Sequence, residues 1–411
     1  MKNDGAEIIN NIDVLIKDNK IIKIAKNIKI NANKVIDATN KYVLPGFINC
    51  HTHIPMTLFK ESGSKYTLQD WLNKFIWPIE AKLTPNDIYY FALLGMLEAI
   101  NNGVTTINDM YFLTENIIKA ANKAKINLIN GPTLMDADGK GEARTTEFKR
   151  IIKKYGNKNI TAGIHGLYTA SEKYIKSLIP FIKQNNLPVH IHFCENKQEI
   201  EDIRKSWKIK TPSEALIKYF RNIKLILAHC VELNQQDINN LKKLDCSIVH
   251  NPTSNMYLAC GVADIKKYLD NDINVCIGTD GPGSGCNGDI LKELRVALLL
   301  QKIKYNNASV INSYEGLKMV TINGAKALGI EKNKGSIDVN KDADLIIVNL
   351  DHLNTVMNND TISNIVYNVN HENIETVIIN GNIVKEKNKL IGFKIDSILK
   401  ECKKLHTKLL K

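Results

Sequence analysis

Short runs rich in Val, Ile and Leu alternate with longer helical patterns between about residues 43 and 280 of this 411-residue chain. The runs are YVLPGFINC, VTTIND, INLINGP, ITAGIHG, LPVHIHF, KLILAHC, CSIVHN and INVCIGTD. Each interval between them is long enough for a helix, and strands that alternate with helices predict parallel βαβ units. Eight such units predict a single α/β domain, a (β/α)8 or TIM-type barrel. A doubly wound open sheet is the alternative.

The two ends of the chain have a different pattern. Residues 12–38 and 335–386 contain short apolar runs and tight turns, such as Asp18-Asn19 and Asn380-Gly381. Each segment is too short to bury a sizeable core alone. We therefore expect the ends to pair into one small composite β-sandwich beside the barrel. The expected boundaries are 1–44 and 333–390 for the two parts of the sandwich, 45–332 for the barrel and 391–411 for a C-terminal basic amphipathic helix.

Composition narrows the class of protein. Hydrophobic residues at 44% and charged residues at 24% exclude a disordered or collagen-like chain. No window reaches 18 uninterrupted apolar residues, so we expect no membrane-spanning helix. The net charge of +12 comes from scattered lysines and from the last helix. No RNP, KH, zinc-finger or helix-turn-helix signature accompanies it, so we expect neither a nucleic-acid nor a membrane partner, and predict that this helix packs on its own domain.

The cysteines indicate the cellular compartment in which the protein works. The eight cysteines form no C-x-x-C pair, and several lie in apolar runs, where free cysteine behaves as a small hydrophobe. The first 20 residues lack the apolar core of a secretion signal. We therefore expect a reduced, cytoplasmic protein. We also expect it to be a homo-oligomer.

Histidines and one aspartate stand at the ends of predicted strands. Because strand side chains alternate, His51 and His53 of the HTH sequence point the same way. His192, His229 and Asp280 also stand where an apolar run stops. His51, His53, His192 and Asp280 would supply three imidazoles and a carboxylate, a set that suits Zn²⁺ or Fe²⁺ and leaves a position for water. The alternative is a group of buried histidines, each satisfied by backbone.

Longer motifs around these residues carry a resemblance. HTHIPMTLFK, HGLYTAS, VHIHFCE, AHCV, HNPTSNMYLACG and GTDGPGS occur in this order. They resemble the metal-dependent amidohydrolase superfamily and, more narrowly, the deaminases of 5′-methylthioadenosine, S-adenosylhomocysteine and 5′-deoxyadenosine. The resemblance covers nearly the whole chain. The run ITAGIHG ends without a lysine that could bridge two metals, so one divalent ion is expected, zinc first and iron second.

The resemblance implies a role for each matching position. His51, His53, His192 and Asp280 match metal ligands. Glu195 matches the acid that hydrogen-bonds a ring nitrogen, and His229 matches the histidine beside the water that attacks the ring. Asp280 also shares that catalytic duty and contacts substrate, as Glu195 does. The remaining substrate-binding matches are Glu80, which grips the ribose hydroxyls, His165 and Arg144.

The physical chemistry agrees with these implied roles. A metal lowers the pKa of water toward about 7, which supplies hydroxide for attack on C6 of adenine. Glu195 can protonate the ring nitrogen if burial raises its pKa. The expected product is the inosine analogue plus ammonia, as in other zinc deaminases where a glutamate that is not a ligand moves protons.

One departure bears on the substrate. Relatives that handle S-adenosylhomocysteine carry a second arginine after the third strand, where this chain has Pro132. An amino-acid tail needs a partner for its carboxylate, and bidentate arginine is the usual one. We therefore expect small neutral 5′-substituents to be preferred.

Other interpretations stay open. The same metal site serves deamination of guanine or cytosine and dechlorination of a triazine, and a barrel can also be a non-catalytic scaffold. The long segment 54–84 carries Trp71, Phe75 and Trp77 and is either a lid over the substrate or locally packed. His190 is expected to fill a layer of the barrel interior or to support a ligand rather than to bind metal.

Overall fold

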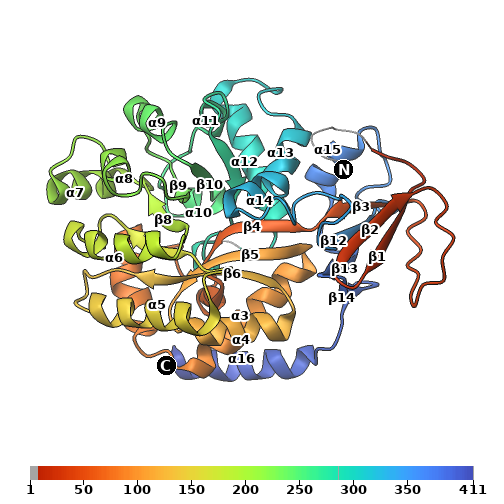
Figure 1. Ribbon diagram of the computed structural model, residues 1–411, viewed down its shortest axis with the longest axis horizontal. Helices are drawn as coiled ribbons and strands as arrows, with labels where there is room; N and C mark the ends of the chain where they lie inside the picture. Colours follow the sequence, from red (N-terminus) through yellow and green to blue (C-terminus); the bar gives the residue numbers. More distant parts are fainter. Residues whose placement is uncertain (1–7, 286, 411) are drawn as a thin grey trace.

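Eight parallel strands form the central sheet of the computed structural model, which describes residues 8–285 and 287–410 (Figure 1). Their order in the sheet is their order in the chain, from β4 to β11. A parallel bridge between Thr52 and Asp280 joins the first strand to the end of the last and closes the barrel. The strands are β4 (Phe47–Thr52), β5 (Val104–Tyr111), β6 (Asn127–Leu134), β7 (Ala162–Gly166), β8 (Val189–Phe193), β9 (Leu225–His229), β10 (Cys246–His250) and β11 (Asn274–Ile277). The predicted TIM-type fold is confirmed.

Helices follow the strands and cover the outside of the barrel (Figure 1). The principal ones are α3 (Pro85–Asn101), α4 (Thr114–Ala124), α5 (Gly141–Tyr155), α6 (Glu172–Gln184), α7 (Lys197–Trp207), α8 (Ser213–Tyr219), α9 (Gln235–Leu241), α11 (Ile265–Leu269) and α12 (Ile290–Tyr305). Shorter helices are η1 (Ile54–Phe59), α1 (Leu68–Trp71), η2 (Leu72–Ile76), α2 (Trp77–Glu80), α10 (Pro252–Tyr257), η3 (Pro282–Ser284), α13 (Ser313–Met319), α14 (Ile322–Leu328) and α15 (Thr361–Asn368).

Two helix starts illustrate the local sequence signals. Thr84 caps α3 in a reciprocal capping box with Asp87, and Pro85 occupies the first turn, where its missing N–H costs nothing. The Ser171 hydroxyl caps α6 by accepting from the Tyr174 backbone N–H at 3.1 Å. Both helices therefore begin at residues whose side chains satisfy a free backbone N–H of the first turn.

The run YVLPGFINC is expected to form one strand, but it forms two. β3 (Lys41–Pro45) pairs with an antiparallel sheet outside the barrel, and β4 begins at Phe47. Gly46 lies between them, where a Cβ atom would come within 2.2 Å of the Thr105 side chain. The chain therefore changes sheets at a position where only glycine fits, and this link places His51 of β4, and His53 just after it, a few residues beyond the outer sheet.

The two chain ends meet in small antiparallel sheets. One has the order β15 (Lys389–Leu390), β14 (Asn382–Glu386), β13 (Ile374–Ile379), β12 (Leu345–Asn349) and β3, and the other pairs β1 (Asp13–Lys17) with β2 (Lys20–Ala25). Figure 1 shows both at one end of the molecule. Ile21 of β2 packs in one apolar cluster with Leu345 and Ile378. The division of the chain at residues 44, 332 and 390 stays our proposal, and residues 1–7 lie outside the described part.

The last helix, α16 (Ile395–Leu409), runs along α3 (Figure 1). Its buried residues Cys402, Leu405 and Leu409 face the barrel, and the Cys402 thiol lies 3.6 Å from the Tyr90 carbonyl oxygen. The lysines lie mainly on the other face, so the basic helix packs on its own chain. In residues 8–285 and 287–410 no helix is long and apolar enough to cross a membrane. The seven cysteines described there are free thiols, and Cys286 lies outside the described residues.

Candidate active site

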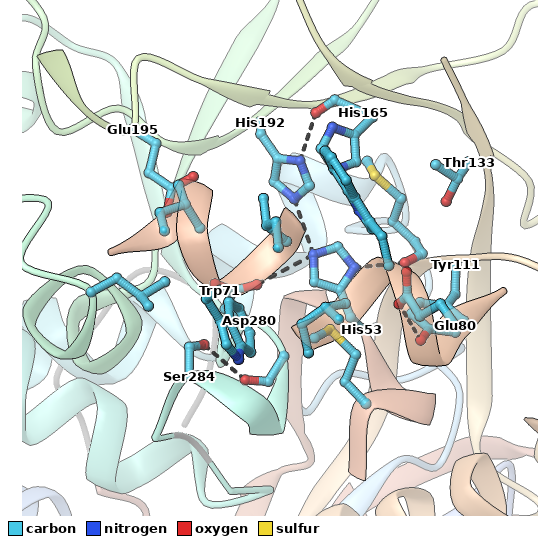
Figure 2. A pocket seen from close by; sticks show the side chains of 18 of the residues that line it. His53, Trp71, Glu80, Tyr111, Thr133, His165, His192, Glu195, Asp280 and Ser284 are labelled. Atoms are coloured by element: carbon cyan, nitrogen blue, oxygen red, sulfur yellow. Dashed lines mark hydrogen bonds and ion pairs between the residues drawn. The ribbon is translucent and has the colours of Figure 1, made fainter. Parts of the chain in front are cut away.

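One cavity is lined by residues at the carboxyl ends of several barrel strands, and Figure 2 shows its side chains. His53, His192 and His229 line it at the ends of three different strands, and Asp280 lines it just after β11. Such a cavity is where barrel enzymes keep their sites. His51 lies beneath the cavity wall, fully buried.

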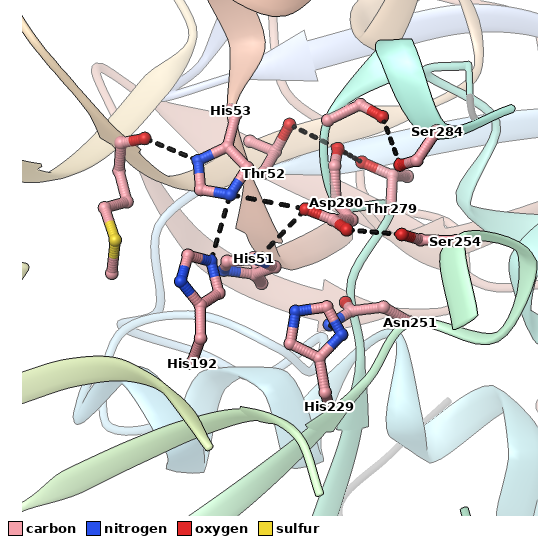
Figure 3. Close-up of polar contacts among 12 residues, drawn as sticks. His51, Thr52, His53, His192, His229, Asn251, Ser254, Thr279, Asp280 and Ser284 are labelled. Carbon is pink, nitrogen blue, oxygen red and sulfur yellow. Dashed lines mark hydrogen bonds and ion pairs between the residues drawn. The ribbon is translucent and has the colours of Figure 1, made fainter. Parts of the chain in front are cut away.

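The predicted metal ligands converge on one point (Figure 3). The Nε2 atoms of His51 and His53 each lie 3.3 Å from Asp280 Oδ1. His53 Nε2 also lies 3.0 Å from His192 Nε2. His51, His192, His229 and Asp280 form a group whose ligand atoms all lie within 4.8 Å of one another. Five donors therefore surround the point, one more than the four assigned from the sequence.

In each predicted histidine ligand, the ring nitrogen that points away from the centre contacts a neighbouring residue. His51 Nδ1 lies 2.7 Å from His190 Nε2, so His190 supports a ligand as expected. His53 Nδ1 lies 2.6 Å from the Met110 carbonyl oxygen, and His192 Nδ1 lies 2.6 Å from that of His165. These contacts fix the rings with Nε2 toward the centre, which is how proteins orient metal-binding histidines.

The protonation states fit a divalent cation. Burial lowers the pKa of His53 to about 4 and that of His192 well below its usual value, so both rings are neutral near pH 7. Burial would raise the pKa of Asp280, but its close contacts with His51, His229 and His53 lower it strongly, so Asp280 is ionised. His51 Nε2 is buried and makes no hydrogen bond to a protein group. Neutral imidazoles, an ionised carboxylate and an unpartnered nitrogen are what a metal centre needs.

The backbone is strained where the strands end at the site. His229 has φ +76° and Asp280 has φ +60°, a left-handed conformation that ordinary residues rarely adopt. The Ser254 hydroxyl donates to Asp280 Oδ2 at 2.5 Å, and the Asn255 side-chain nitrogen lies 2.9 Å from His229 Nδ1. The surrounding contacts thus hold both residues in costly conformations that aim their side chains into the cavity.

Glu195 is the buried acid of the site. Burial first, and then the charge of Asp280, raise its pKa well above the usual value, which favours its protonated form. Its Oε1 lies 3.8 Å from His229 Nδ1 and accepts a hydrogen bond from the Cys260 thiol at 3.6 Å. A protonated Glu195 beside an ionised Asp280 would let the first act as an acid and the second as a base.

Glu199 holds the turn that carries Glu195, a role that the sequence analysis missed. Its two carboxylate oxygens accept the backbone N–H groups of Cys194 at 3.1 Å and Glu195 at 2.6 Å. Asn196 caps α7 by accepting the Glu199 N–H. The sequence Asn196-x-x-Glu199 is a capping-box pattern, which is the signal that could have revealed it.

Glu80 lies at another side of the cavity from Glu195 (Figure 2). The Tyr111 hydroxyl donates to Glu80 Oε1 at 2.5 Å and orients it, a contact not foreseen from the sequence. Burial raises the pKa of Glu80 to about 7, although this hydrogen bond and the charge of Arg144 oppose the rise. His165 also lines the cavity, and its Nδ1 contacts the Thr169 hydroxyl at 2.9 Å.

Arg144 does not line the cavity, unlike the other residues that are predicted to bind substrate. Its guanidinium is paired with Asp138 and lies 5.3 Å from the ring centroid of Phe112, which is part of the wall. From β6, Thr133 lines the cavity, whereas Pro132 does not.

The segment 54–84 consists of the short helices η1, α1, η2 and α2 rather than open loop. Trp71 and Trp77 line the cavity, whereas Phe75 packs against Phe59 and Tyr66. η2 is a π-helix, a rare form that occurs frequently at functional sites. The segment therefore builds one wall of the cavity and also has its own packing.

Comparison with known proteins agrees with this geometry. Residues 42–384 match the model of the amidohydrolase family. The 5′-deoxyadenosine deaminase of Methanobrevibacter smithii is 40% identical over 402 residues, which cover 95% of this chain and 92% of that protein. The 5-methylthioadenosine/S-adenosylhomocysteine deaminase of Caldanaerobacter subterraneus is 34% identical over 408 residues, covering 97% and 94%. An adenosine deaminase from Xanthomonas campestris with bound zinc superposes with a TM-score of 0.92 at 25% identity, covering 98% of this chain and 95% of that one.

The fold and the site thus define a barrel hydrolase with a metal centre. The chain belongs to the amidohydrolase family.

Proposed function

We propose that this protein hydrolyses the 6-amino group of 5′-modified adenosines, such as 5′-deoxyadenosine and 5′-methylthioadenosine, to give the inosine analogue and ammonia. One observation carries the proposal: a single cavity holds both the Glu195–His229–Asp280 cluster and the Glu80–Tyr111 pair. The first suits attack on a ring and the second suits a ribose diol. The names of the relatives agree with this substrate class.

We assign His51, His53, His192 and Asp280 as the residues that hold the metal, with His229 beside them. We propose zinc rather than iron, which the zinc of the Xanthomonas campestris structure supports. When bound, the ion lowers the pKa of water toward neutrality and so supplies a nucleophile.

The protein's own groups then carry the protons. Glu195 enters protonated and gives its proton to N1 as water attacks C6, so negative charge does not build up on the ring. Asp280 enters ionised and accepts one proton of the attacking water, with neutral His229 alongside. Asp280 passes this proton to the amino group, which departs as ammonia. The hydroxyl group on C6 then gives its proton to Glu195 and becomes the carbonyl of the product, which restores the starting state of Glu195.

The cavity walls bind and orient the nucleoside. Glu80, held by Tyr111, accepts hydrogen bonds from the ribose hydroxyls. Trp71 and Trp77 cover the cavity and exclude water from the ring. His165 lies at the same wall as His192, and its carbonyl oxygen holds the His192 ring.

Ammonia release from a panel of adenosines, free purines, cytosine and a chlorotriazine tests the proposal. We expect 5′-deoxyadenosine and 5′-methylthioadenosine to be the best substrates. A Glu80→Gln variant should lose at least tenfold in kcat/KM on these nucleosides and should not change activity on free adenine, which has no ribose. Preference for guanine, cytosine or the triazine would refute the nucleoside assignment. No ammonia from any compound, with metal bound, would instead indicate a non-catalytic barrel.

We also propose that the protein works in the cytoplasm as a homo-oligomer. Light scattering of the purified chain tests the second point, and a monomer at micromolar concentration would contradict it.

A further inference from the structure

We infer that Asp138, by occupying the guanidinium of Arg144 at the rim of the cavity, selects against nucleosides whose 5′-substituent carries a carboxylate. The inference rests on the proposed function and assigns a specificity-determining residue for it.

The ion pair uses the end-on edge of the arginine, which its two terminal nitrogens form. The two terminal nitrogens of Arg144 donate to the two carboxylate oxygens of Asp138 at 2.5 and 2.6 Å. One of them also donates to the Met135 carbonyl oxygen at 2.9 Å. The Arg144 side chain is only 14% exposed, so it is held rather than free in solvent. The same hydrogen bonds lower the pKa of Asp138 to about 2, so the pair persists throughout the range of an assay.

The pair stands next to the substrate cavity. Arg144 packs on Phe112, a wall residue, and its partner Met135 follows the wall residue Thr133 by two positions. Its charge acts within the cavity, because it opposes the burial-induced rise of the Glu80 pKa and contributes to the low pKa of His165, which is caused mainly by burial. No lysine or arginine is among the described residues that line the cavity. Arg144 is therefore the cation available to a charged tail at this rim.

A carboxylate on the 5′-substituent can bind Arg144 bidentately in two ways. It must displace Asp138 from the end-on edge, or take the side-on edge of Nε and a terminal nitrogen beside the ionised Asp138, and both are unfavourable. Pro132 offers no donor in compensation. A 5′-hydrogen or a methylthio group has no such need and meets the ring of Phe112 and the side chain of Met110. The ion pair thus neutralises the Arg144 guanidinium, which could otherwise bind a carboxylate.

An Asp138→Asn variant tests the inference. It keeps the size of the side chain and removes its charge. Glu142→Gln is the matched control, because Glu142 is exposed, lies four residues away and makes the same charge change without contacting Arg144. Asp138→Ser serves as a second variant in case the amide impairs folding. The substrates are 5′-deoxyadenosine, 5′-methylthioadenosine, S-adenosylhomocysteine and 5′-(2-carboxyethylthio)-5′-deoxyadenosine, which has a carboxylate but no ammonium group.

We expect wild type and Glu142→Gln to prefer the two neutral nucleosides. Asp138→Asn should raise kcat/KM about tenfold for both carboxylate substrates and leave 5′-deoxyadenosine within twofold, since one charged hydrogen-bonded contact has about that value. The gain should vanish in Asp138→Asn/Arg144→Gln. No gain, or a loss on S-adenosylhomocysteine because Asp138 binds its ammonium group, would overturn the inference while leaving the deaminase proposal intact. Failure of wild type to deaminate 5′-deoxyadenosine would refute the proposed function and this inference with it.

Discussion

Removal of the Glu199 carboxylate should loosen the turn that holds Glu195, our proposed catalytic acid. Glu199 is buried, and its two oxygens accept the backbone N–H groups of Cys194 and Glu195 at 3.1 and 2.6 Å. Glu199→Ala leaves both donors unsatisfied. At about 1–3 kcal/mol for each buried donor, the free energy of unfolding should fall by about 2–6 kcal/mol. The Asn196 cap remains and limits the damage to the turn.

The effect on catalysis should exceed that of lost stability. A displacement of about 1 Å can cost about a hundredfold in rate, so we expect kcat on 5′-deoxyadenosine to fall by that order while KM changes little. Metal content should persist, because His192 lies on β8 and keeps its contact with the His165 carbonyl oxygen.

The assay compares Glu199→Ala with Glu199→Gln and with Glu201→Gln, an exposed position on the same helix. Glu199→Gln retains one carbonyl acceptor and should recover part of the rate. Steady-state kinetics, metal analysis and urea unfolding are measured on each variant. A folded Glu199→Ala variant with kcat within twofold of wild type would refute the reasoning. Parallel loss of metal and activity would show that the turn supports the metal centre instead.

Three further predictions follow from single residues. His192→Ala should lose both metal and ammonia release, and zinc added after chelation should restore wild type but not the variant; activity without metal would contradict the assignment. Tyr111→Phe should raise KM for nucleosides several-fold with free adenine unaffected, because Glu80 loses its orienting hydrogen bond; equal effects on both substrates would contradict a ribose role. Burial raises the pKa of Glu293 to about 7 from 4.5, so its contribution to stability is present below pH 4.5 and is lost as pH rises through 7. Urea unfolding should therefore show Glu293→Gln gaining about 2–3 kcal/mol on wild type between pH 5 and pH 8, and a constant difference would contradict the pKa.

Regular features of the fold were predictable because they depend on neighbours in sequence. Alternation of apolar runs with helices predicted the barrel, and strand ends located His192 and Asp280. The break of the first strand at Gly46 was not predictable, since the reason is a contact with Thr105, on a neighbouring strand.

The same limit applies to the site. Tyr111 and Glu80 are separated by 31 residues and meet only when the wall forms. The motif resemblance implies that Arg144 binds substrate, but it does not reveal that the guanidinium donates to Asp138. Sequence patterns show which groups are present, whereas the pairing of charges depends on three-dimensional geometry.

The pairing of β3 with β12 has a consequence for biosynthesis. Pro45 and Leu345 are register partners separated by about 300 residues. At roughly 5–20 residues per second, β3 leaves the ribosome about 15–60 s before its partner strand. During that interval its backbone hydrogen-bonding groups lack their final partner, which is a recognised aggregation risk. The β1–β2 hairpin needs no such delay, because its strands are neighbours in the chain. Chains truncated before β12 should therefore aggregate through this strand even when most of the barrel sequence is present.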